Sequence, residues 1–310
     1  MKLFRYYNFD SSDVLISILD SVVNHYVRLS NTAKSNDIIE QVKVDDNGYV
    51  KEVRNKYPFI NYASFCQTDR VSLAMCQNFS TLNGIIIEYE CEDNKLFESD
   101  DFCKVEYVEN PVGCLLEIPN KLKNFKYEEK YMTTMDMEYI KKEQFVLKEF
   151  LRYKQLDFKY ENEWRFIPHP YTYKLKIQQE HQIIKNTFKP KHLENIFNEV
   201  ELPEYLKVKR IYLAFRLYFN LMPIVESLSF YHKYGVNNLG ADKKMEIQKF
   251  KNYVSILKTY SYIIKNKYGY EDNILYGLHL NDKSVLEYME FPFVNPKHFY
   301  DEFEKEVKSN

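Results

Sequence analysis

The ten residues FKYENEWRFI, positions 158–167, hold the densest group of ionisable side chains that could act together chemically. Glu161 and Glu163 are two positions apart, and Arg165 follows two positions later. In an extended chain, side chains two positions apart point to the same face. The spacing therefore predicts a strand with two carboxylates and one guanidinium on one face, solvated or lining a cleft. Four aromatic residues would share the opposite, inward face: Phe158, Tyr160, Trp164 and Phe166.

Two carboxylates at this spacing lie roughly 7 Å apart on a strand. One can stabilise a developing cation while the other activates a nucleophile, and their mutual repulsion would raise the pKa of one of them. The alternative is structural, with Glu161 and Glu163 paired to Lys159 or to a neighbouring strand. The spacing by itself favours this alternative. We expect Arg165 to pair with a carboxylate on its own face, and Tyr160 and Trp164 to lie in the core.

The composition excludes several classes of protein. Among the 310 residues, 45% are hydrophobic and 28% are charged, and the formal net charge is −2. This balance argues against a strongly basic nucleic-acid surface and against an acidic tail. The N-terminus carries no long apolar run and no window approaches 18 apolar residues, so we expect neither a signal peptide nor a transmembrane helix.

The cysteines predict reduced thiols in a cytoplasmic protein. The chain has an odd number of them, five, and no Cys-x-x-Cys pair, which disfavours a disulfide framework or a zinc knuckle. They are Cys66, Cys76, Cys91, Cys103 and Cys114.

Several motifs that bind phosphate or metal are missing from the sequence. The chain has only seven glycines, and it contains neither G-x-G-x-x-G nor G-x-x-x-x-G-K-[ST], so the backbone cradle of Rossmann and P-loop sites is lacking. It also contains no His-Glu-x-x-His and no G-x-S-x-G, and its seven histidines are scattered. We therefore expect no metal site.

The periodicity predicts an α+β fold with a mixed or antiparallel sheet. The expected helices are the segment from Ser11 to Val23 and the ranges 71–80, 133–155 and 242–264. The expected strands are 2–9, 25–31, 62–69, 84–90, 102–109, 158–167, 207–215 and 286–293. We predict a single domain over residues 1–310, with a strand-rich, catalytic core at 1–217 and a mostly helical extension at 218–310.

Four blocks of the sequence resemble a bacterial family that is catalogued as domain of unknown function 2971. LFRYYNF, with Arg5, is similar to the family's opening strand, and HYVRLSNTAKSNDIIE is similar to its second block. The third block is ASFCQTDRVSLAMCQNFSTLNGIIIEY. The most specific match is tyrosine-glutamate-x-glutamate-tryptophan-arginine, which begins here at Tyr160. The resemblance covers residues 1–170 and, more weakly, KRIYLAF.

The chain departs from the family pattern at two places. The family's middle block carries tryptophan, histidine and tyrosine, and its late strand is followed by glycine, proline and lysine. The corresponding residues here are Cys76, Asn78 and Phe79, and then Ala214, Phe215 and Arg216. If those family residues bind substrate, this chain is a divergent member whose activity is in question.

The order of the candidate residues along the chain also looks like that of ADP-ribosyltransferases, although the likeness is more distant. The likeness implies that Arg5 binds the phosphate and ribose of NAD and that Ser64 supports the nicotinamide ribose, with Ser30 as the competing serine. It implies that Glu163 bonds the ribose 2′-hydroxyl and stabilises the oxocarbenium ion, while Glu161 orients the acceptor. The implied fold is the split sheet of ADP-ribosyltransferases, and the implied cofactor is NAD, used as a substrate.

Three functions follow from these observations as alternatives. The first is an NAD-consuming ADP-ribosyltransferase, of the kind that acts as a bacterial defence or toxin effector, with a protein, a nucleic acid or a small molecule as the acceptor. The second is a non-catalytic binding module of the same fold. The third is a nucleic-acid-acting effector that uses exposed aromatic side chains and basic ones such as Lys207, Lys209 and Arg210. No membrane partner is expected, and the sequence leaves the oligomeric state open.

Overall fold

The computed structural model describes residues 1–31, 60–80, 84–123, 135–168, 199–214, 241–280 and 286–290. The chain divides into two units that are interleaved in sequence. Unit 1 consists of Met1–Leu3, His25–Gln67 and Cys91–Leu206, and unit 2 consists of Phe4–Asn24, Thr68–Glu90 and Lys207–Asn310. The predicted boundary at residue 217 falls outside the described residues.

Unit 1 contains eight described strands. The eight are β2 Tyr26–Arg28, β3 Ser30–Asn31, β4 Asn61–Gln67, β6 Phe102–Lys104, β7 Glu106–Val108, β8 Tyr153–Gln155, β9 Glu163–Phe166 and β10 Glu199–Glu201. Of these, β3, β4, β9 and β6 are antiparallel neighbours in one sheet. Strand β9 lies between β4 and β6 and is antiparallel to both, and β3 extends the sheet beside β4. Two further pairs form, β10 antiparallel to β2 and β7 parallel to β8.

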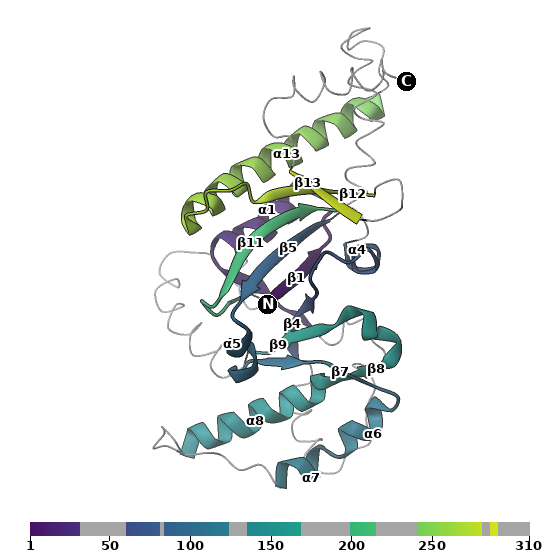
Figure 1. Cartoon of the computed structure of the whole chain (residues 1–310), viewed down its shortest axis with the longest axis vertical. Coiled ribbons are helices and arrows are strands. Elements are labelled where there is room, and N and C mark those ends of the chain that lie inside the picture. The colour runs from purple at the N-terminus through teal and green to yellow at the C-terminus, as the bar shows by residue number, and fades with distance from the viewer. Residues whose placement is uncertain are drawn as a thin grey trace. The chain divides into compact units, whose positions relative to one another are not determined.

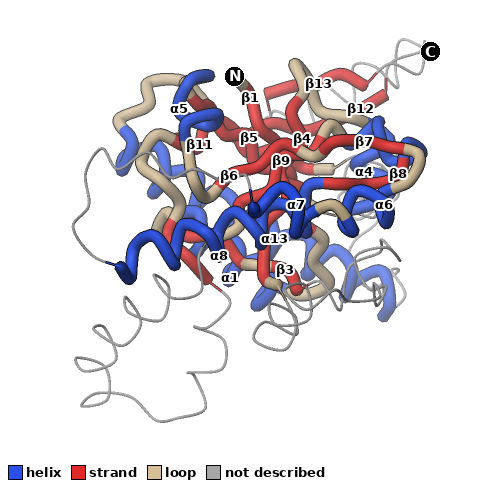
Figure 2. Tube along the Cα trace, turned by 90° about the horizontal axis from the view of Figure 1, so that it is seen from below, coloured by secondary structure: helices blue, strands red, loops and turns tan. Residues whose placement is uncertain are grey.

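The helices of unit 1 are α5 Asp93–Glu98, α6 Pro111–Leu116, α7 Ile118–Lys123, α8 Met135–Arg152 and the 3₁₀ helix η2 Leu156–Glu161. Three of them, α6, α7 and α8, build a core beside β6 and the end of β9. In Figures 1 and 2, α6 and α7 lie beside α8 on one side of these strands. Val146, Leu147 and Leu151 of α8 are buried against Ile167 and other apolar residues of that core. Fully burying such a side chain contributes roughly 1.5–3 kcal/mol, so the packing of this face holds α8 in place beside the strands.

Unit 2 is a mixed sheet covered by helices. Its elements are β1 Lys2–Tyr7, α1 Ser12–Val23, α4 Leu73–Phe79, β5 Ile85–Cys91, β11 Leu206–Leu213, α13 Ala241–Tyr268, β12 Leu275–Leu280 and β13 Leu286–Glu290, apart from end residues of β1, β5 and β11 that belong to unit 1. The strand order is β13-β12-β11-β5-β1, with β11 parallel and β13 antiparallel to β12.

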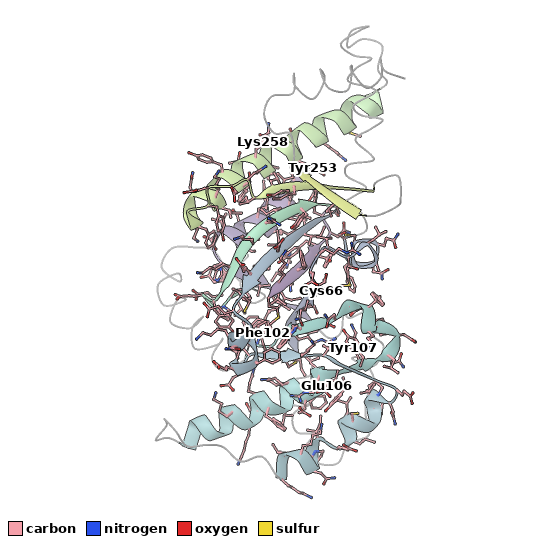
Figure 3. The ribbon with its side chains drawn as sticks, viewed as in Figure 1. Cys66, Phe102, Glu106, Tyr107, Tyr253 and Lys258 are labelled. Carbon is pink, nitrogen blue, oxygen red and sulfur yellow. The ribbon has the colours of Figure 1, made fainter. Side chains whose placement is uncertain are left out.

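Tyrosine side chains of helix α13 contact α1 and also Phe9, which precedes α1 in the sequence. The ring of Tyr253, labelled in Figure 3, packs edge-on against Phe9 with the ring centroids 5.2 Å apart, and the hydroxyl of Tyr260 donates to the carboxylate of Asp20. Helix α1 begins where the hydroxyl of Ser11 accepts a hydrogen bond from the backbone N–H of Val14.

The predicted α+β class and mostly antiparallel sheet are confirmed, and so are the helices near α1, α4, α8 and α13. The predicted strand at 102–109 is two strands, because the chain passes from β6 through Val105 into β7, where it pairs with β8 instead of β9. The strand predicted at 158–167 is wrong over its first half, and β12 was not predicted. Among the described residues, no helix is long and apolar enough to cross a membrane.

Gly84, at the entrance to β5, is required by a close backbone approach. A Cβ atom at this position would lie 1.7 Å from the carbonyl oxygen of Tyr7 and 2.8 Å from the Cβ of Ser80. Neither neighbour is the flexible end of a long side chain, so the backbone itself would have to move.

We predict that Gly84→Ala lowers the free energy of unfolding by about 3 kcal/mol, the upper end of what overpacking costs. The measurement is urea unfolding followed by circular dichroism. Gly269→Ala is the matched control, since that glycine has φ 67° but no atom within 4 Å of its added Cβ, so only about 1 kcal/mol of backbone strain is expected. Equal losses in the two variants would contradict the close approach at Gly84.

Candidate functional site

The two glutamates of FKYENEWRFI lie close together around Lys154, although they belong to different elements of secondary structure. Glu161 ends the 3₁₀ helix η2, and Asn162 follows in the left-handed conformation, with φ 42° and ψ 56°. Only then does the chain become extended, in β9 from Glu163 to Phe166. The prediction that Glu161 and Glu163 lie on one face of a continuous strand is therefore wrong, because the left-handed residue breaks the alternation between them.

Glu163 and Arg165 form a buried ion pair on one face of β9. Nε of Arg165 donates to Oε1 of Glu163 over 2.9 Å, and an Nη2 hydrogen bond of 3.1 Å reaches Oε2. Nη1 donates to the carbonyl of Leu151 at the end of α8, at 2.8 Å, and the guanidinium lies 4.9 Å from the ring centroid of Tyr62. The expected pairing of Arg165 with a carboxylate on its own face is confirmed.

Lys154 bridges the two carboxylates. Its Nζ donates to Oε2 of Glu161 at 2.7 Å and to Oε2 of Glu163 at 3.2 Å, so both acids share one ammonium group. The hydroxyl of Ser64 donates to Oε1 of Glu163. Ser64 reaches this oxygen because β4 and β9 pair antiparallel with Ser64 opposite Arg165. We call these five residues, Ser64, Lys154, Glu161, Glu163 and Arg165, the Glu163 cluster.

The charged side chains of the Glu163 cluster are almost completely removed from solvent. The exposed fraction is 2% for Glu161, 4% for Glu163 and 0% for Arg165, and Lys154 is buried as well. Strand β9 is buried along its whole length, on both faces, so the face that was expected to be solvated or to line a cleft is not solvated. Buried charges are tolerated only where they are paired and hydrogen-bonded, as they are here.

The cluster gives its two carboxyl groups opposite proton affinities. Burial raises the pKa of Glu161 to about 7, and the nearby Glu163 adds to this while Lys154 offsets part of it. Burial would also raise the pKa of Glu163, but the charges of Arg165 and Lys154, together with hydrogen bonds from Arg165 and Ser64, hold that pKa well below its usual range. Glu163 is thus a fixed anion, while Glu161 can exchange a proton near neutral pH.

This division of roles suits chemistry at a carbon that becomes cationic. An acid and a base are recognised by titratable pairs whose environments push their pKa values apart. A permanently ionised carboxylate can stabilise positive charge that develops on a sugar ring, and a second carboxyl with a pKa near 7 can take up the proton of an acceptor.

The other predicted site residues lie at different places. Of the two competing serines, Ser64 contacts Glu163, whereas Ser30 lies exposed on β3 opposite Tyr62. Arg5 is buried on β1 in unit 2, where its guanidinium lies 5.1 Å from the ring centroid of Tyr7. The structure therefore joins Ser64, Glu161 and Glu163 within unit 1, and Arg5 is part of the other unit.

The prediction that Phe158, Tyr160, Trp164 and Phe166 share one inward face is correct for only two of these residues. Trp164 is in the core as predicted, with Phe166 on the same face of β9. Tyr160 is 45% exposed, because η2 turns it outward. Phe158 is half-buried and lies over the Lys154 ammonium, with 4.9 Å between Nζ and the ring centroid.

Two residues of the site could not be found from the sequence pattern. Lys154 stands seven positions before Glu161, in a strand that pairs with β7, and only the fold turns it toward the acids. Tyr107, labelled in Figure 3, lies on β7, and its hydroxyl accepts a 2.9 Å hydrogen bond from the backbone N–H of Glu163. Lys159, which the sequence offered as the partner, is exposed on η2.

Two of the cationic residues that the sequence offered for nucleic-acid binding, Lys209 and Arg210, have acidic partners in unit 2. Nζ of Lys209 lies 3.3 Å from the carboxylate of Glu90, and Nη1 of Arg210 lies 4.0 Å from that of Glu88, which also accepts from the hydroxyl of Tyr212. In the part of the chain that the structure describes, no three His, Cys, Asp or Glu side chains gather in a way that could hold a metal ion.

Comparison with known proteins leaves the family of the chain open. A scan against models of protein families finds no match, and searches of the curated proteins and of the solved structures find none either. The resemblance to the family of unknown function and the likeness to ADP-ribosyltransferases therefore stay predictions. Any function has to be argued from the Glu163 cluster itself.

We predict that Arg165→Met lowers the free energy of unfolding by about 3 to 5 kcal/mol, because it removes the bidentate partner of a buried carboxylate. Urea unfolding followed by circular dichroism is the measurement. Lys159→Met is the matched control, since it removes an exposed cation of η2 and should change stability by no more than about 0.5 kcal/mol. A loss below about 1 kcal/mol in Arg165→Met would mean that the buried pair contributes no more than an exposed one.

Proposed function

We propose that the chain is an ADP-ribosyltransferase-like enzyme that uses NAD as its substrate and that it belongs to the bacterial family described by domain of unknown function 2971. One observation carries the proposal. Ser64 and Glu163, which the likeness to ADP-ribosyltransferases names as site residues, stand 99 positions apart in the sequence and share a hydrogen bond. The split sheet of ADP-ribosyltransferases is part of the same proposal.

Glu163 would stabilise the charge that forms when NAD loses nicotinamide. The bond between C1′ of the ribose and the nicotinamide nitrogen breaks, and nicotinamide leaves with the bonding electron pair, so positive charge develops on the ribose. Arg165 and Lys154 lower the pKa of Glu163, which therefore remains an anion at neutral pH. A fixed carboxylate beside the ribose lowers the barrier to this step.

Glu161 would complete the transfer by accepting a proton. The acceptor's nucleophilic atom forms a bond to C1′ and releases its proton, and a carboxylate close by can take it. Because burial raises the pKa of Glu161 to about 7, this group changes between acid and base in the neutral range. The role that the likeness gives to Arg5, binding of the phosphate and ribose of NAD, stays part of the proposal and draws no support from the cluster.

A second candidate is a non-catalytic binding module of the same fold. The observation that favours it is the burial of Glu161 and Glu163, each of which has a cationic partner inside the protein. In this alternative the cluster would only hold β8, η2 and β9 together. It predicts that NAD neither binds to the protein nor is consumed.

We predict that the wild-type protein, incubated with NAD and cell extract, releases nicotinamide and that Glu163→Gln reduces the rate by about 10²- to 10³-fold. NAD should also raise the unfolding temperature of the wild type. Since Glu163→Gln leaves Arg165 with a neutral partner, its folding is checked by circular dichroism. Asp157→Asn, which removes an exposed carboxylate of η2, is the matched control and should keep the wild-type rate. A folded wild type that neither releases nicotinamide nor is stabilised by NAD would leave the binding module as the surviving candidate.

We also predict that kcat/KM for nicotinamide release rises as the pH rises through about 7. Glu161 acts as a base only when ionised, so the activity is lost below the pKa of this group and levels off above it. Steady-state kinetics between about pH 5 and pH 9 measures this. Glu161→Gln should show a low, flat profile, and a wild-type rate that falls with rising pH would exclude a basic role for Glu161.

A further inference from the structure

The 3₁₀ helix η2, Leu156–Glu161, contacts the Glu163 cluster through two side chains: Glu161, which belongs to the cluster, and Phe158, whose ring lies over the Lys154 ammonium. Four of its six residues are exposed, Phe158 is half-buried, and Glu161 is buried. Lys154 lies two positions before η2 and Glu163 two positions after Glu161, so both ends of this segment meet at the cluster. Glu161 therefore acts as a plug, a buried carboxylate at the end of a segment whose other residues are exposed or half-buried.

The plug is held mainly by charges. Lys154 on β8 donates to Glu161 at 2.7 Å. On β9, Glu163 repels the carboxylate of Glu161 and Arg165 attracts it, while Tyr107 on β7 is close enough for the charge of Glu161 to raise its pKa. Among the residues that the structure describes, these four are the titratable and charged groups that interact with Glu161 from the neighbouring strands.

The backbone on either side of the plug is suited to movement. A 3₁₀ helix has poorer hydrogen-bond geometry than an α-helix, and Gln155 provides no side-chain cap at the start of η2. At the other end, Asn162 is in the left-handed conformation, and its backbone carbonyl accepts a 2.9 Å hydrogen bond from the backbone N–H of Gln67 on β4. Asn162 can thus stay anchored to β4 while the residues before it move.

We propose that η2 is a releasable cover of the Glu163 cluster and that ionisation of Glu161 drives its release. When Glu161 leaves, Lys154 keeps its contact with Glu163, and Arg165 remains tied to Leu151. Release would remove one anion from the cluster and open Glu163 to solvent. That this controls access to a catalytic group rests on the proposed function, but the movement itself does not.

The direction of the pH effect follows from linkage. Glu161 has a pKa of about 7 when covered, against an ordinary value of 4.5 that it would regain in water. Protonation therefore favours the covered form, and raising the pH through this interval favours release. For these two values, the equilibrium constant for release is expected to increase on the order of 50-fold between about pH 5 and pH 8.

Hydrogen exchange of the backbone amides of η2 tests this proposal. Exchange is measured by mass spectrometry on the full chain at about pH 5 and pH 8 and is corrected for the intrinsic exchange rate at each pH. We expect η2 in the wild type to open tens of times more at the higher pH, whereas α8 keeps its protection. Glu161→Gln should remove this difference, because its side chain does not ionise, and Asp157→Asn should retain it.

The outcomes separate this proposal from the proposed function. Corrected exchange that is equal at the two pH values in the wild type, or a pH effect that persists in Glu161→Gln, would overturn the releasable cover. A pH effect confined to wild type and Asp157→Asn supports it, whether or not NAD is consumed. If that effect is found and no nicotinamide is released, the results support η2 as a releasable cover and contradict the proposed transferase activity.

Discussion

The buried pairing of Arg165 with Glu163 is the constraint to which the rest of unit 1 is fitted. A guanidinium with no exposed surface needs partners in several directions, and the fold provides them: the carboxylate on its own strand, the Leu151 carbonyl at the end of α8, and the Tyr62 ring on β4. These contacts fix α8, β9 and β4 relative to one another. They also bring Lys154 within reach of Glu163, because β8 begins directly after α8.

Stability alone does not explain such a cluster. Replacing a buried ion pair with well-packed hydrophobic residues is often neutral or stabilising, since the removal of two charges from water costs more than their attraction returns. The hydrophobic residues that surround α8 show that this region has apolar material for a conventional core. The four charged residues of the Glu163 cluster are therefore better explained by a role for their charges, either in specifying the fold or in chemistry.

The sequence pattern was reliable inside elements and failed at their junctions. Alternation correctly placed Glu163 with Arg165 on one face of β9, since it holds wherever the chain is extended. It failed for Glu161 and Tyr160, because a single left-handed residue, Asn162, changes which face the preceding side chains occupy. The partner Lys154 could not be predicted, because its position depends on the packing of α8 and the pairing of β7 with β8.

For Glu161, a rise in pH favours both the ionised form of its carboxyl group and the departure of that group from the cluster. Its ionised form is the one that can accept a proton, and it is also the form that burial disfavours. Covered and protonated, Glu161 is a neutral plug; ionised, it gains hydration by leaving the cluster. Glu163 behaves in the opposite way, because Arg165 stabilises its charge in place. A cluster built from one anchored and one releasable carboxylate therefore couples the exposure of Glu163 to the protonation state of Glu161.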